Sequence, residues 1–147
     1  MGCVAAEAAN RTGAHRLHPQ CKRALVKCTA KSTCGKFGFG RFVNTLGKPM
    51  SFINLTGHMH KRGLMFTAWR SNGTKLYQNF DWAHPLGVLY DPPFVLASGD
   101  WIDYECLHDN GVTRPVKLDA FGKPTDLRFG VTTDDEMCIL PGVYYTD

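Results

Sequence analysis

The sequence predicts an all-β fold, an antiparallel β-sandwich of the jelly-roll type, and three observations lead to this prediction. From residue 43 onward the chain consists of short segments rich in β-branched and aromatic residues, separated by turn residues. Residues 101–106 alternate between two faces, as a half-buried strand does. No segment shows a convincing amphipathic helical period, so two packed antiparallel sheets are expected.

Each expected strand ends at residues that favour turns. Ser71-Asn72-Gly73 predicts a hairpin turn, because Asn-Gly readily adopts positive φ. Asp91-Pro92-Pro93 is expected to interrupt the β-structure, and Ser98-Gly99-Asp100 to form another turn. The expected strands span residues 50–60, 64–70, 75–80, 94–96, 101–106, 128–131 and 137–145.

The residue pattern divides the chain into an irregular, cysteine-containing leader, residues 1–42, and the β-sandwich, residues 43–147. The leader has no sustained period and includes the glycine-rich stretch 35–40. Much of the positive charge lies there, in a chain whose formal net charge is only +4. A solvated leader explains this charge better than a nucleic-acid surface does, so no nucleic-acid partner is expected. No apolar run approaches the roughly 20 residues of a membrane span.

Cysteine usage predicts the compartment. An even number of cysteines without a Cys-x-x-Cys pair favours disulfides over a zinc ribbon. Disulfides in a small domain imply an oxidising, extracytoplasmic location, either secreted or periplasmic. The six cysteines are Cys3, Cys21, Cys28, Cys34, Cys106 and Cys138.

His58 and His60 are the first candidate metal ligands. On a strand, side chains two residues apart leave the same face, so both imidazoles can reach one ion. Two imidazoles suit zinc, copper, nickel or iron. The alternative to a metal site is a pair of half-exposed strand histidines without a ligand.

Met137, next to Cys138, is the kind of residue that fills gaps in a core. If it met the two histidines, its thioether would select copper over zinc. Spacing alone does not pair these distant segments.

Several motifs in order resemble one family. They are Gly57-His-Met-His-Lys-Arg-Gly63, Tyr104-Glu-Cys-Leu-His-Asp-Asn110, Asp134-Asp-Glu-Met-Cys138 and Tyr144-Tyr145. Together they resemble the C-terminal domain of the copper type II, ascorbate-dependent monooxygenases, which include peptide-amidating and dopamine-hydroxylating enzymes. They are more similar still to small bacterial single-domain relatives. The resemblance covers residues 51–145.

This resemblance implies a site and a disulfide. His58, His60 and Met137 match the ligands of the copper that binds O2 and hydroxylates a nearby C–H bond, and Cys106 and Cys138 match a family disulfide.

His84, in Asp81-Trp-Ala-His-Pro85, either completes or flanks the site, or organises a loop around Trp82 with Asp81. His108 is expected in a loop. Asp134, Asp135 and Glu136 form either second-shell acceptors for the ligating imidazoles or a solvated acidic turn.

The chain also departs from the family. The enzymes hold a second copper through three histidines of a separate N-terminal domain, and only His15 and His18 precede His58 here. The amidating members anchor their substrate with Arg, Asn and Tyr at positions occupied by Thr56, Ile139 and Pro141. Because a threonine cannot replace a bidentate arginine, peptide amidation is not expected.

Three functions therefore remain open. The first is a mononuclear copper domain of an oxidative protein, with electrons from ascorbate, another reductant or a partner domain. The second is a non-enzymatic copper carrier or sensor, in which soft ligands hold Cu(I) for transfer. The third is an interaction module that keeps the sandwich without using metal.

Overall fold

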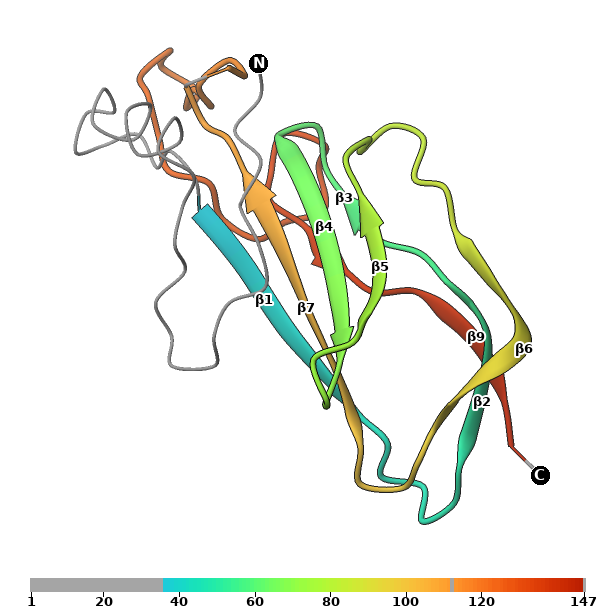
Figure 1. Cartoon of the computed structure of the whole chain (residues 1–147). Helices are drawn as coiled ribbons and strands as arrows, with labels where there is room; N and C mark the ends of the chain where they lie inside the picture. Colours follow the sequence, from blue (N-terminus) through green and yellow to red (C-terminus); the bar gives the residue numbers. More distant parts are fainter. Residues whose placement is uncertain (1–35, 112, 147) are drawn as a thin grey trace.

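The computed structural model describes residues 36–111 and 113–146, with the backbone alone at 36–39. Over this part the chain forms β-strands and no helix (Figure 1). The strands are β1 (Lys36–Val43), β2 (Met50–Leu55), β3 (His58–Met59), β4 (Gly63–Arg70), β5 (Lys75–Asn79), β6 (Val88–Leu96), β7 (Trp101–His108), β8 (Cys138–Ile139) and β9 (Gly142–Tyr145). No helix in the described residues has the length and apolarity needed to cross a membrane.

The strands form two sheets and a short ribbon. The larger sheet has the order β1-β7-β4-β5, the smaller one β6-β2-β9, and β3 pairs with β8 in the ribbon. Every strand pair is antiparallel. The predicted all-β, antiparallel sandwich is therefore confirmed.

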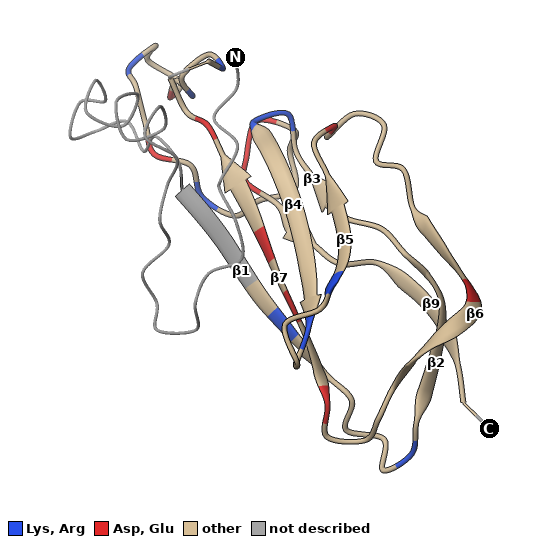
Figure 2. Cartoon of the chain, viewed as in Figure 1, with Lys and Arg blue, Asp and Glu red and all other residues tan. Residues whose placement is uncertain are grey.

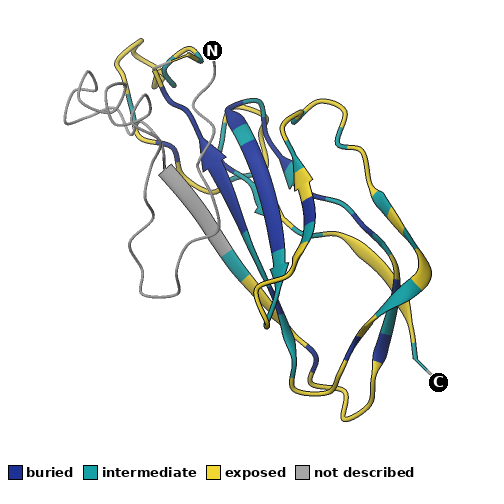
Figure 3. Ribbon diagram, in the orientation of Figure 1, coloured by how far each residue is buried: buried dark blue, intermediate teal, exposed yellow. Residues whose placement is uncertain are grey.

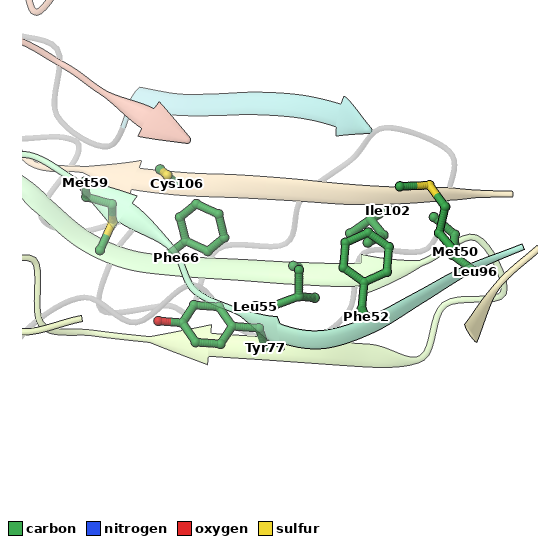
Figure 4. Close-up of a cluster of buried hydrophobic side chains, with 10 residues drawn as sticks. Met50, Phe52, Leu55, Met59, Phe66, Tyr77, Leu96, Ile102 and Cys106 are labelled. Atoms are coloured by element: carbon green, nitrogen blue, oxygen red, sulfur yellow. The ribbon is translucent and has the colours of Figure 1, made fainter. Parts of the chain in front are cut away.

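The hydrophobic core lies between the sheets, where β2 contributes Phe52 and Leu55 and β4 contributes Phe66 (Figure 4). Phe66 is fully buried, and its ring stacks on that of Tyr104 with centroids 5.7 Å apart. Burying a side chain of this size contributes roughly 1.5–3 kcal/mol. Figure 3 shows the most buried backbone along β4 and β7, the inner strands of the larger sheet.

The predicted leader is wrong at its C-terminal end. Residues 36–43 form β1, which pairs with β7 along its whole length, so the glycine-rich stretch is a strand. Gly40 lies opposite Tyr104, and a Cβ there would be 2.2 Å from Cζ of that ring. Glycine at this position makes room for an aromatic neighbour and does not mark a loop. The remaining leader, residues 1–35, lies outside the described residues.

Two other expected boundaries differ from the structure. The strand expected at 50–60 breaks after Leu55, and a Cβ at Gly57 would be 2.4 Å from Cγ of Phe66. Asp91-Pro92-Pro93 lies within the bounds of β6, but the register with β2 passes from Phe94 directly to Leu89, so the expected break is present as an interruption of the pairing. Because β6 is an edge strand, it tolerates prolines that a central strand would exclude.

The C-terminal segments also differ from the expectation. Residues 128–131 form no strand, and only an isolated bridge joins Phe129 to Glu136. The strand expected at 137–145 divides into β8 and β9 around Leu140-Pro141. The predicted turns at 71–73 and 98–100 are present, with φ of 87° at Gly73 and 83° at Gly99.

Candidate metal site

The β3–β8 ribbon brings the two candidate metal-binding segments together. His58 pairs with Ile139, and Met59 pairs with Cys138. Continued by one position, the same antiparallel register sets His60 opposite Met137. Two segments that spacing could not connect are therefore neighbours in the fold.

The two faces of this ribbon have different surroundings. Met59 is only 1% exposed and belongs to the core, and Cys138 forms a disulfide with the buried Cys106 of β7. Directly opposed residues share a face, and successive residues alternate. His58 and Ile139 therefore lie on the opposite face, and the same alternation assigns His60 and Met137 to it. The disulfide implied by the family resemblance is present.

The two histidine rings are close enough to share an ion. Their centroids are 5.2 Å apart and their planes are perpendicular. A ring bound through a nitrogen about 2 Å from an ion has its centroid roughly 3 Å from that ion, so both rings can reach one ion. Burial, and secondarily the neighbouring His60, lower the pKa of His58. The lowered pKa favours the neutral imidazole, which is the form that binds metal.

His60 carries a buried nitrogen that lacks a partner. His60 is only 6% exposed, and its Nδ1 has no hydrogen-bond partner among the described residues. Leaving such a group unsatisfied costs about 1–3 kcal/mol. A metal ion bound to this nitrogen would remove that penalty, so the residue fits the role of a ligand.

The turn from β3 to β4 fixes the position of His60. The amide of Gly63 donates to the carbonyl oxygen of His60 over 2.7 Å and closes the turn. A Cβ at Gly63 would lie 2.6 Å from Cβ of Met59, so a larger residue would displace the inner face of the ribbon. Glycine at the end of His60-Lys-Arg-Gly63 is thus required by close packing.

Ion pairs hold the loop that leads into Met137. Asp134 accepts hydrogen bonds from Lys61, at 2.6 Å, and from Arg62, at 3.0 Å, and these bonds lower its pKa. Figure 2 shows the basic residues at the β3–β4 turn. Asp135 accepts from Lys117 and from the Thr132 hydroxyl, which lower its pKa to about 2.

The acidic residues 134–136 combine an exposed turn at Asp134, in keeping with the solvated alternative, with a paired Asp135 and a buried Glu136. The carboxylates of Asp134 and Asp135 face lysine, arginine and threonine donors, and Glu136 is buried. The amide of Glu136 donates to the carbonyl oxygen of Arg128 over 2.9 Å. The segment is thus ordered by its partners immediately before Met137.

His108 is not in a loop, and that expectation is wrong. It is the last residue of β7 and is fully buried, with Nε2 3.3 Å from the carbonyl oxygen of Met137. The signal was present in the sequence, because His108 continues the alternation of the buried Ile102 and Cys106. The burial of Arg62 is not predictable from local sequence, since a charged residue in a turn is ordinarily exposed.

His84 lies at an exposed place in the β5–β6 loop. Its side chain is 84% exposed, and its Nδ1 lies 3.4 Å from a carboxylate oxygen of Asp81. The other oxygen of Asp81 accepts from the amides of Ala83 and His84, while Trp82 packs against the core. The loop-organising alternative describes this arrangement.

Among the described residues, no three His, Cys, Asp or Glu side chains gather closely enough to hold a metal ion. His84, Asp135 and Glu136 therefore form no such group with His58 and His60, and a role for them as additional or flanking residues of the site stays a prediction. A third protein ligand for the histidine pair has to be of another type, and the thioether of Met137 is the candidate on the same face.

No protein-family model matches this chain, and no curated protein is detectably similar to it.

Proposed function

We propose that this chain binds one copper ion through His58, His60 and Met137. The β3–β8 pairing carries the proposal, because it sets the segment of Met137 beside the two histidines. The buried Nδ1 of His60 supports it, since a metal ion would satisfy that nitrogen. Two imidazoles with one thioether favour copper over zinc, and the thioether stabilises Cu(I).

The proposed role is that of a mononuclear copper domain resembling the O2-activating half of the copper type II monooxygenases. Copper bound there would supply redox chemistry and O2 activation. Three protein ligands leave a position open for O2 or another small ligand. Electrons would come from ascorbate, another reductant or a partner domain.

The chain's own residues shape this position. Burial lowers the pKa of His58, which favours its neutral imidazole, and the disulfide at Cys138 fixes the residue next to Met137. Ile139 lies directly across from His58 and is 41% exposed, so an apolar side chain borders the site. The same disulfide supports an extracytoplasmic location, secreted or periplasmic.

Copper loading of the purified protein with ascorbate, followed by X-ray absorption at the copper edge, tests the proposal. We expect one Cu(I) per chain, with a sulfur scatterer that is lost in Met137→Leu, a substitution that conserves volume. His58→Ala should bind copper more weakly. His84→Ala, at the exposed histidine outside the site, is the matched control and should behave as wild type.

Weak or substoichiometric binding by the wild-type protein would overturn the proposal, as would identical spectra for all four proteins. Oxygen consumption with ascorbate then separates the two copper functions. Consumption above that of free copper supports an oxidative domain. Tight Cu(I) binding without consumption identifies a carrier or sensor instead.

A further inference from the structure

Arg62 is a charged residue in an unusual environment. It follows Lys61 in the β3–β4 turn and is only 4% exposed, whereas the side chain of Lys61 is 39% exposed. Removing a guanidinium from water is costly unless it is paired and hydrogen-bonded. Such a residue in a turn therefore points to a specific set of partners.

The partners of Arg62 come from two other segments. Its Nε donates to the carbonyl oxygen of Pro115 over 3.2 Å, and its Nη1 donates to the carbonyl oxygen of Asp134 over 2.9 Å and to Oδ1 of Asp134 over 3.0 Å. Its own carbonyl oxygen accepts from the amide of Asp109 over 2.9 Å. One residue thus joins the histidine turn to the 109–115 segment and to the loop before Met137.

Met137 is tethered on its other side by different means. The carbonyl oxygen of Met137 lies 3.3 Å from Nε2 of His108, and Cys138 is linked to Cys106. Both tethers originate on β7, and both act at or after Met137. Arg62 is a tether that acts before it, three residues upstream, and it originates in the turn that follows His60. Lys61, Lys117 and the amide of Glu136 also hold this loop, but Arg62 is the buried cation that contacts both the backbone and the side chain of Asp134.

From this arrangement we infer that Arg62 is a positioning residue for the metal site. Its guanidinium holds the loop before Met137 against the turn that carries His60, and so sets the thioether relative to the two imidazoles. The inference rests on the proposed copper site. A lysine cannot do this, because a single ammonium does not reproduce the fixed fork of donors that spans Pro115 and Asp134.

The test compares Arg62→Met and Arg62→Lys with Lys61→Met. Lys61 pairs with the same Oδ1 of Asp134 but from an exposed position, where ion pairs contribute little. It is therefore the matched control. We expect the Cu(I) affinity of both Arg62 variants to fall about 10- to 100-fold, as removal of residues that orient metal ligands usually does. Lys61→Met should stay within a few-fold of wild type.

Two readouts separate positioning from a loss of overall structure. In X-ray absorption, the Arg62 variants should lose the sulfur scatterer while keeping the nitrogen ligands. In the metal-free protein with methyl-labelled methionine, the Met137 methyl resonance should move from its wild-type chemical shift, while the core Met59 methyl keeps its chemical shift. If Arg62→Met does not fold, Arg62→Lys, which retains the charge, decides the question.

The outcomes distinguish this inference from the copper proposal. If wild type and Lys61→Met hold copper with sulfur, and the Arg62 variants do the same with equal affinity and an unchanged Met137 methyl shift, the role of Arg62 is refuted and the site stands. If lysine restores every property, charge alone matters and the positioning role is refuted. If wild type itself binds no copper, the proposed function fails, whereas the Met137 methyl shift in the metal-free variants still decides whether Arg62 positions that residue.

Discussion

The disulfide between Cys106 and Cys138 connects the central strand β7 to β8, and the effect of removing it can be worked out. The two cysteines are separated by 32 positions, and closing a loop of that length lowers the entropy of the unfolded chain by an amount equivalent to about 3.7 kcal/mol. Cys106 is fully buried, so replacing both cysteines with alanine also removes packing contacts, for which we add about 0.5 kcal/mol. The double variant should therefore be less stable by about 4 kcal/mol.

A loss of this size is a large part of the stability of a small domain, which is about 5–15 kcal/mol. Urea denaturation followed by tryptophan fluorescence would measure it, since Trp69, Trp82 and Trp101 all lie within the described sandwich. The free energy of unfolding of wild type should fall on adding a thiol reductant. The double variant Cys106→Ala/Cys138→Ala lacks this disulfide. Any change that the reductant causes in its free energy of unfolding therefore comes from the other four cysteines.

A destabilisation below about 1 kcal/mol would refute this reasoning. It would mean either that the bond does not form in the purified protein or that the unfolded chain is already compact between the two cysteines. Mass spectrometry of the alkylated, unreduced protein distinguishes these explanations, because only the first leaves Cys106 and Cys138 free to react.

Three further predictions follow from packing and charge. Gly57→Ala should destabilise the fold by about 1–3 kcal/mol, because the new methyl meets the Phe66 ring; an unchanged thermal midpoint would contradict this. The Asp134 carboxyl should titrate below its usual pKa of 3.8 in a carbon-detected NMR titration, and Lys61→Met should raise that pKa. Because the folded pKa is the lower one, this carboxylate's stabilisation is present above pH 3.8 and is lost as the pH falls through the folded pKa. Burial raises the pKa of Tyr90 to about 12, so the folded chain keeps a proton that the unfolded chain releases near pH 10, and stability should decrease as the pH rises between these values. Ultraviolet titration should show a late-ionising tyrosine that is absent in Tyr90→Phe, and its persistence in that variant would reject the assignment.

Local patterns predicted much of the fold. The alternation at 101–106 identified β7, and Asn-Gly identified the β4–β5 hairpin, because both signals depend only on neighbouring residues. The glycine-rich β1 was missed because its meaning depends on Tyr104, a residue of another strand. The break at Gly57 was missed for the same reason, since only the position of Phe66 explains it.

The candidate site was predictable to a similar degree. His58 and His60 follow from the two-residue repeat of a strand, which needs no tertiary information. The position of Met137 follows only from the β3–β8 pairing, which no local pattern encodes. The tether from Arg62 was hidden, because burial of a charged residue depends on partners elsewhere in the chain, whereas the buried position of His108 continues the alternation of β7.

The β3–β8 pairing has a consequence for the order in which the protein is made. The two strands are about 80 residues apart, a separation that takes several seconds to synthesise at about 5–20 residues per second. During that interval the nascent chain already carries both histidines, but the strand next to Met137 does not yet exist. An ion captured early would meet only part of the proposed ligand set, so loading of the proposed site should follow the emergence of β8 and the oxidation of Cys106 with Cys138.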